Sequence, residues 1–328
     1  MAFVTRPVGV SSAGSRPARA QLLAVTAVVV AAMLLTLVAL VNAAAYTVVE
    51  TTNEPSPGDD AGRYRAMAVD GTERILETVN RASHETTRSA RVAAVDGLTT
   101  LNDDLSEIAT ESGSVAYLGS NVARTTPGWI VSTGGMDGSL VNASGAGAYT
   151  VAADVDRSRR VVLVVDPTRL ERTTRHDAIE QAFRVVFETQ TTTNAVYVYR
   201  TAGDVVVAAG TDAETPRVVC AVSDVSEREE LRLALSEERL GTVRCPDLWP
   251  AASLADARTY RIGVENADAA EGTLTMVVQT ATTPESPPTA DHSGVSPGVY
   301  DATVVVGYAS ETHRFETTVR VAPGEPRV

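Results

Sequence analysis

The N-terminal part of the chain contains a long apolar run, from Gln21 to Val49. Its central stretch, residues 22–41, is interrupted only by two threonines, whose hydroxyls can bond back to their own helix. About 20 apolar residues are needed to cross the hydrocarbon core of a bilayer. The run therefore predicts a transmembrane helix over residues 21–49.

The charges on either side of this run predict its orientation. Arg6, Arg16 and Arg19 precede it, whereas the first acidic residue of the chain is Glu50. Cytoplasmic flanks carry an excess of positive charge. We therefore expect residues 1–20 to be a basic cytoplasmic leader and the bulk of the chain to be extracellular. This gives a single-pass protein of the cell membrane, with the lipid bilayer as a partner.

Residues 50–60 read as a linker, because they contain two prolines, a glycine and several acids. Residues 61–113 then show helical periodicity, in which Gly71 and the Asp96-Gly97 pair predict breaks and Gly113 predicts a C-terminal cap. We expect two or three helices that pack as a layer on a sheet, with a stalk as the alternative. The clearest apolar stripe is Leu98, Leu101, Leu105 and Ile108.

From residue 114 the pattern changes to short β-branched and aromatic runs between turn-forming residues, which predicts strands. The Ala195–Arg200 and Asp204–Ala209 runs flank Thr201-Ala202-Gly203, a hairpin signal. Val161–Val165 is continuously apolar, as a central buried strand is. The other predicted strands are Trp129–Ser132, Tyr149–Val155, Ala182–Glu188 and Arg217–Val222.

One helix is expected to interrupt the strands. Ser226 and Glu229 match a capping box, leucines 231, 233, 235 and 240 follow, and Gly241 can end the helix. The C-terminal part predicts two antiparallel hairpins, which pair Arg258–Asn266 with Thr273–Thr280 and Val299–Tyr308 with His313–Val321.

Together these segments predict an α+β fold. An N-terminal transmembrane helix is followed by a helical segment and then by a β-rich, largely antiparallel extracellular domain over residues 114–328. The β-rich part has enough apolar residues for a core of its own, as one large domain or two smaller ones.

The chain is strongly acidic. Aspartate and glutamate number 41 against 28 basic residues, all of them arginine, and the formal net charge is −13. A surface of this sign repels phosphate backbones, so we expect no nucleic-acid partner. Because the sequence holds no lysine, a Walker A loop, a Schiff-base lysine and a Ser-x-x-Lys nucleophile are excluded.

Two sites of covalent modification are predicted. Cys220 and Cys245 are expected to form a disulfide in an oxidising compartment, where it would brace the predicted helix against the sheet. Two buried thiols or a two-cysteine metal site are the alternatives. Asn142 begins an Asn-Ala-Ser sequence between glycine-rich turns, which is an acceptor pattern for N-glycosylation.

No catalytic, metal or cofactor site is expected from the motifs. None of the four histidines stands in a metal-ligand spacing. Asp154 and Asp156 could hold a hard cation, but Arg157, Arg159 and Arg160 follow at once and are expected to pair with them instead. We therefore expect a protein that is not an enzyme and needs no cofactor.

The residues just before the apolar run carry a further signal. Arg19, Ala20 and Gln21 resemble the cleavage site of the type IV pilin family, in which a basic and a small residue precede the hydrophobic segment. The resemblance covers residues 15–49. It implies cleavage by a prepilin peptidase after Ala20 and packing of the apolar helix against other pilin-like subunits. The acidic, lysine-free composition resembles that of proteins from extremely halophilic archaea.

Two other fates of the apolar run stay open. It could remain as an uncleaved anchor, or it could be a secretory signal that is cut at Ala43-Ala44-Ala45. In addition, Val25 stands where many pilins carry a glutamate.

The functional hypothesis is a membrane-anchored extracellular pilin-like protein with a structural or adhesive role, as a minor pilus subunit or accessory. The alternative is a single-pass cell-surface binding module outside the pilus system. Isolation of a dispersed monomer that is absent from sheared filaments would favour the alternative.

Overall fold

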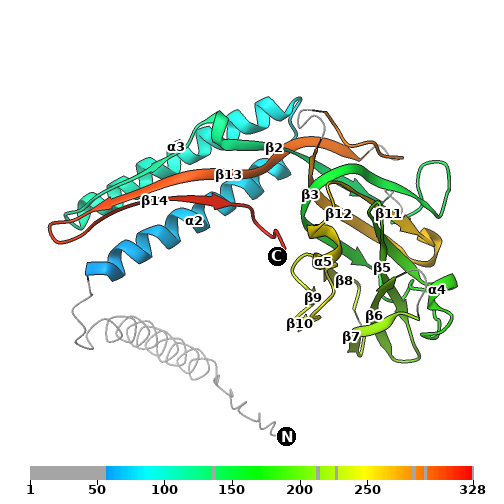
Figure 1. The fold of residues 1–328 in the computed structure, drawn as a ribbon. Helices are drawn as coiled ribbons and strands as arrows, with labels where there is room; N and C mark the ends of the chain where they lie inside the picture. Colours follow the sequence, from blue (N-terminus) through cyan, green and yellow to red (C-terminus); the bar gives the residue numbers. More distant parts are fainter. Residues whose placement is uncertain are drawn as a thin grey trace, which may run out of the picture. The chain divides into compact units, whose positions relative to one another are not determined.

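The computed structural model describes residues 57–326, apart from 135–137, 212–214, 226–227, 282–285 and 292–293. Within these residues, fourteen strands form one antiparallel sheet, and four α-helices accompany it (Figure 1). The two long helices are α2 (Pro57–Arg81) and α3 (Thr87–Glu111), and the two short ones are α4 (Ala178–Gln181) and α5 (Ala251–Ala255).

Both ends of α3 are capped, and the sequence predicts the cap at the C-terminal end. The Thr86 side chain accepts a hydrogen bond from the Ser89 N–H, and the Ser89 hydroxyl oxygen accepts one from the Thr86 N–H. At the other end Gly113 has a φ of 74°, and the Ser114 N–H donates to the Ala109 carbonyl at 2.9 Å. Gly113 is therefore the predicted C-terminal cap.

The predicted helix breaks at Gly71 and Asp96-Gly97 are wrong, because both glycines serve helix packing. A Cβ at Gly71 would lie 2.7 Å from Leu101 Cδ2, and one at Gly97 would lie 2.9 Å from Ile75 Cγ2. Leu101 of α3 therefore packs against Gly71 of α2, and Ile75 of α2 packs against Gly97 of α3. The actual break between the helices is at residues 82–86, and residues 57–60 of the predicted linker already belong to α2.

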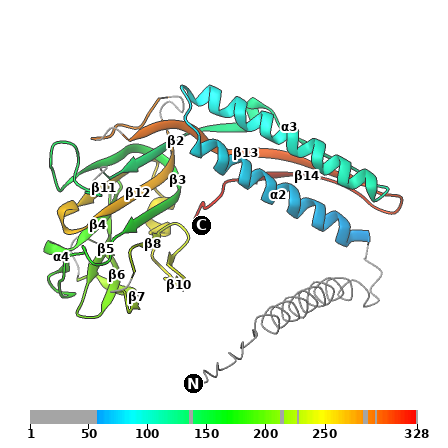
Figure 2. The ribbon, with the colours of Figure 1, turned by 180° about the vertical axis from the view of Figure 1, so that it is seen from behind.

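The two long helices cover one face at one end of the sheet (Figure 2). The strands beneath them are β1 (Val115–Gly119), β13 (Val295–Ala309) and β14 (Arg314–Val321). Side chains of both helices and all three strands form a separate apolar core, with Leu76, Leu98 and Val304 among its most buried members. The helices are thus a layer on the sheet.

The order of the sheet is β1-β13-β2-β12-β3-β11-β4-β5-β6-β7, with β14 on β13 and β8 on β3. The central strand is β3, Tyr149–Val165, which joins two runs that the sequence predicts as separate strands. The others are β2 (Thr125–Thr133), β4 (Phe183–Glu188), β5 (Thr193–Arg200), β6 (Asp204–Thr211), β7 (Arg217–Ser223), β8 (Leu231–Ala234), β9 (Arg239–Leu240), β10 (Val243–Arg244), β11 (Tyr260–Glu265) and β12 (Gly272–Thr280).

The larger core lies on one face of strands β2 to β6, β8, β11 and β12. Val161 and Leu163 of β3 are fully buried in it, so the prediction of a central buried strand at Val161–Val165 is confirmed. The β5–β6 and β13–β14 hairpins are also confirmed.

Two other predictions about the β-rich part are wrong. The stretch that the sequence predicts as a capped helix contains β8 and β9, because Leu231 and Leu233 are buried while Arg232 between them is exposed. This alternation is the period of a strand. In addition, β11 and β12 do not pair with each other; they lie on opposite sides of β3 and pair with it.

The predicted fold class also needs a correction. Among the described residues, none of the helices has the length and apolar character needed to cross a membrane. Helices α2 and α3 have 25 residues each, but charged side chains occur along both. Residues 1–56, which include the leader and the predicted transmembrane helix at 21–49, lie outside the described residues. The transmembrane, single-pass and cell-membrane predictions are therefore not supported, and the fold is a β-rich antiparallel sheet with helices.

Candidate functional site

The predicted processing site lies outside the described residues. Arg19, Ala20 and Gln21 all precede Pro57, where the described part begins. Their role therefore stays a prediction from the sequence.

The predicted disulfide between Cys220 and Cys245 is present, with the two Cα atoms 5.3 Å apart. Cys220 belongs to β7, the last strand of the sheet order, and Cys245 directly follows β10. The bond therefore ties a terminal strand to the segment after β10, rather than to a helix. It is consistent with an oxidising environment.

Asn142 occupies a tight turn whose conformation it stabilises. Its side-chain oxygen accepts hydrogen bonds from the Ser144 N–H at 3.0 Å, the Ser144 hydroxyl at 2.7 Å and the Ala146 N–H at 2.8 Å. The side chain is partly buried. The acceptor sequence is thus a folded turn, and its glycosylation stays a prediction.

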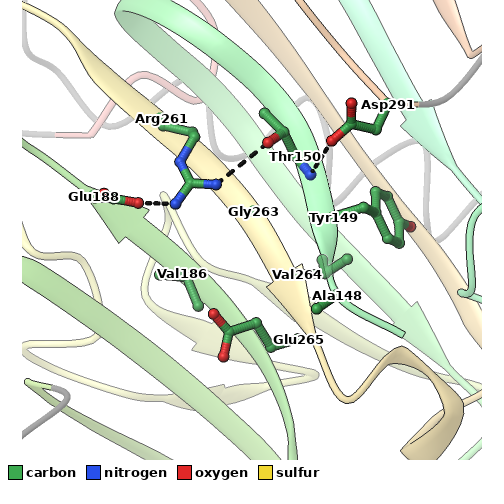
Figure 3. Close-up of a pocket in the computed structure, with 10 residues that line it drawn as sticks. All are labelled: Ala148, Tyr149, Thr150, Val186, Glu188, Arg261, Gly263, Val264, Glu265 and Asp291. Atoms are coloured by element: carbon green, nitrogen blue, oxygen red, sulfur yellow. Dashed lines mark hydrogen bonds and ion pairs between the residues drawn. The ribbon is translucent and has the colours of Figure 1, made fainter. Parts of the chain in front are cut away.

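A polar hollow of about 270 Å³ lies on strands β3, β11 and β4 (Figure 3). Gly263, in the middle of β11, pairs with Thr150 on one side and Val186 on the other. Because glycine has no side chain, the sheet is indented there. Arg261 closes one end of the hollow, since it donates to the Glu188 carboxylate and, at 3.3 Å, to the Thr150 hydroxyl.

The other end of this hollow is also occupied by an ion pair. Glu265 accepts a hydrogen bond from Arg184 Nε at 2.7 Å, and the Arg184 guanidinium lies over the Tyr197 ring. Asp291 accepts from the Thr150 N–H at 2.9 Å. Each carboxylate that lines the hollow is therefore held by a neighbour. The residues that line it include no histidine, cysteine or serine.

Arg159 of β3 is a completely buried arginine. Its two terminal nitrogens donate to the Pro323 carbonyl at 2.8 Å and the Val299 carbonyl at 3.0 Å, and the guanidinium lies 5.7 Å from the centre of the Tyr300 ring. Its Nε has no partner among the described residues. Burial lowers the pKa of Arg159 to about 10, so the side chain is charged at neutral pH.

The sequence predicts that the arginines at positions 157, 159 and 160 pair with Asp154 and Asp156. For Arg159 this prediction is wrong, because its guanidinium donates to two carbonyl groups. Its neighbour Arg160 pairs instead with Glu77 of α2, at 2.6 Å. The contact between Arg157 and Asp156, at 3.9 Å, is the one that agrees with the prediction.

A second ionic cluster connects the C-terminal segment to the sheet. Arg320 donates to Asp301 at 2.6 Å and to the two oxygens of Glu325 at 2.5 and 2.9 Å, and the Tyr300 hydroxyl donates to Glu325 at 2.9 Å. Burial raises the pKa of Glu325, but the hydrogen bonds from Arg320 and Tyr300 outweigh it, so the pKa lies below its ordinary value. The hydrogen bond to Glu325 raises the pKa of Arg320.

A second hollow of about 270 Å³, which we call the arginine hollow, lies beside Arg159. The end of α2 and strands β2, β3, β8 and β12 contribute to it. Its charged residues are Arg81, Arg159, Arg160, Arg232 and Glu77, and its apolar residues are Ile130, Val162, Met276 and Val277. The motifs of the sequence give no indication of this hollow, because its residues come from five separate elements.

Among the described residues, no three histidine, cysteine, aspartate or glutamate side chains are grouped so that they could hold a metal ion. Comparison with known proteins gives no match to a family, to a curated protein or to a solved structure.

Proposed function

We propose that the protein is a non-enzymatic, pilin-like subunit or accessory of a filament, which acts through assembly or adhesion. The observation that carries the proposal is the open edge of β14. This strand has eight residues and, within the part of the chain that the structure describes, pairs with β13 alone. An unpaired edge presents backbone N–H and C=O groups that a strand of another chain can bind.

The edge of β1, on the other side of β13, differs from that of β14 because side chains of a helix occupy it. At the outer edge of β1, the Leu118 N–H donates to the Asn102 side chain at 2.7 Å, and the Ala116 carbonyl accepts from the Ser106 hydroxyl at 3.0 Å. Both side chains belong to α3. Helix α3 therefore occupies the edge of β1, whereas no such cover is present on β14 among the described residues.

The charges of β14 favour a second copy of this chain as the occupant. In an antiparallel pair about a two-fold axis through Thr318, Glu316 of each copy lies opposite Arg320 of the other. Within one chain Glu316 accepts a hydrogen bond from Tyr117 and Arg320 binds Asp301 and Glu325, so the contact between copies would add to these bonds. Opposite charges at such cross-strand positions are favourable, and like charges are not. A two-fold axis at Thr317 would instead place Arg314 opposite Arg320. The sequence of β14 therefore selects the register through Thr318.

A single cysteine tests this pairing. Thr318 is exposed, and residues directly opposite each other in an antiparallel pair have Cα atoms about 4.5–5.5 Å apart, which is within the range of a disulfide. Thr318→Cys should give a covalent dimer on mild oxidation, seen on a non-reducing gel. Thr100→Cys, at an exposed position of α3, should not. Equal cross-linking of the two variants would refute pairing through β14.

A second candidate function is that of a binding module that works as a monomer, which the arginine hollow favours. The two functions differ in a simple observation. A pilin-like subunit should be found in sheared filaments, whereas a binding module should be absent from them and dispersed in solution.

A further inference from the structure

We infer that the arginine hollow binds a small organic anion, namely a carboxylate carried on a compact apolar body. This inference goes beyond assembly and does not depend on the pairing of β14. It rests on the charge of the hollow, on the burial of Arg159, on the accessible guanidinium of Arg232 and on the apolar residues of the hollow.

The charge of the hollow is opposite to that of the protein. Four arginines and one glutamate line it, whereas the whole chain has a formal net charge of −13. The glutamate is already committed, since Glu77 pairs with Arg160 at 2.6 Å. The remaining arginines therefore give a local positive potential that attracts an anion from solution.

Arg159 brings a buried positive charge to this hollow. Its hydrogen bonds go to two carbonyl groups, and its Nε has no partner among the described residues. Buried charges are normally paired with a counter-charge. Within the described part of the chain no carboxylate makes an ion pair with Arg159. The carboxylates of Asp301 and Glu325 stabilise its charge without an ion pair, and an anion bound in the hollow would add negative charge on the side of the hollow.

Arg232 offers the accessible donor. It is exposed on β8, between the buried Leu231 and Leu233, and its guanidinium has no hydrogen bond or ion pair with a described residue. A guanidinium presents paired N–H groups that match the two oxygens of a carboxylate. Arg232 is therefore the residue that we expect to contact the anionic group first.

The apolar residues define the rest of the ligand. Val162, Met276 and Val277 are buried, and Ile130 is partly buried. A hollow of about 270 Å³ lies just below the usual size of ligand sites, which begins at about 300 Å³. It would accept one ring or a short branched chain, and it would not accept a long lipid chain.

Titration calorimetry on the full chain tests the inference, with benzoate as the probe. Benzyl alcohol has the same ring without the charge, and inorganic phosphate has charge without the ring. We expect saturable binding of benzoate at one site, which weakens as salt is added. We expect no binding of benzyl alcohol and weaker binding of phosphate than of benzoate. Phosphate that binds more tightly than benzoate would refute the apolar part of the ligand.

Two matched variants locate the site. Arg232→Gln should weaken benzoate binding about tenfold or more, because a hydrogen bond to a charged group is lost. Arg258→Gln removes the same charge from an exposed position outside the hollow and should leave the affinity unchanged. Absence of saturable benzoate binding, or equal affinities of the two variants, would overturn the inference. The Thr318→Cys cross-link should be unaffected by Arg232→Gln, so failure of one proposal is distinguishable from failure of the other.

Discussion

Gly128 of β2 lies directly against the backbone of Tyr300 in β13. A Cβ at Gly128 would stand 2.6 Å from the Tyr300 nitrogen. The register of the two strands shifts between Val299 and Asp301, so Tyr300 sits in an irregularity of the ladder. Its ring lies 5.7 Å from the Arg159 guanidinium and 6.0 Å from that of Arg320. The glycine thus permits the bulge that places this aromatic ring between two arginines.

Replacement of this glycine should therefore be costly. We expect Gly128→Ala to lower the free energy of unfolding by about 1–3 kcal/mol, because the methyl group meets backbone atoms that cannot rotate away. Gly119→Ala is the control, since no atom lies within 4 Å of a Cβ there. Urea denaturation measures both variants. Equal stability of the two would contradict this explanation of Gly128.

The buried arginine should stabilise the C-terminal segment. Arg159→Ala leaves the carbonyls of Val299 and Pro323 without this donor and opens a cavity, so we expect a loss of about 3 kcal/mol or more. Amide hydrogen exchange should increase at Ala322, Gly324 and Glu325. Arg157→Ala serves as the control, because that side chain is exposed and its nearest carboxylate is 3.9 Å away. A loss no larger than that of the control would show that Arg159 has no structural role.

The Glu325 cluster predicts an acid-sensitive component of stability. The folded-state pKa of Glu325 lies below its ordinary value, so the ionised form is favoured by folding. This contribution is present above the ordinary pKa of about 4.3 and is lost as the pH falls towards the folded-state pKa. The thermal unfolding midpoint should be measured at several values between about pH 3 and pH 6. As the pH is lowered, it should fall less steeply in Glu325→Gln than in the unmodified protein. Glu311→Gln, at an exposed position, should keep the original slope; an unchanged slope in Glu325→Gln would contradict the assignment.

Reduction of the disulfide should weaken the fold without changing its core. The bond joins residues 25 positions apart, for which loop entropy gives a stabilisation of about 3 kcal/mol. Urea denaturation with and without a reducing agent should show a difference of this order. The double variant Cys220→Ser, Cys245→Ser should match the reduced protein and be insensitive to reductant. An identical midpoint in all samples would mean that the bond contributes nothing.

Local patterns predict the parts of this fold that depend on neighbouring residues. The β5–β6 hairpin follows from the turn at Thr201-Ala202-Gly203, and Gly113 ends α3 as its position indicates. By contrast, β11 and β12 look like a hairpin but pair with β3, which precedes them by about a hundred residues. Pairing over such a distance depends on the whole sheet and leaves no local signal.

The hollow and the buried arginine could not be predicted for a related reason. Alternation along β3 would place Arg159 on the same face as Val161, in the large core. The register with β12 shifts at this point, and Arg160 has a φ of 54°. As a result Arg159 lines the arginine hollow together with Val162. A bulge reverses the face of every residue beyond it, and no turn-forming residue marks this one in the sequence.

Mass spectrometry of the protein in sheared filaments from its native source tests whether the chain is a processed pilin-like subunit. We expect the chain to be present in the filaments and its first residue to be Gln21. Absence of the chain from the filaments, or a first residue at Met1 or Tyr46, would show that it is not such a subunit.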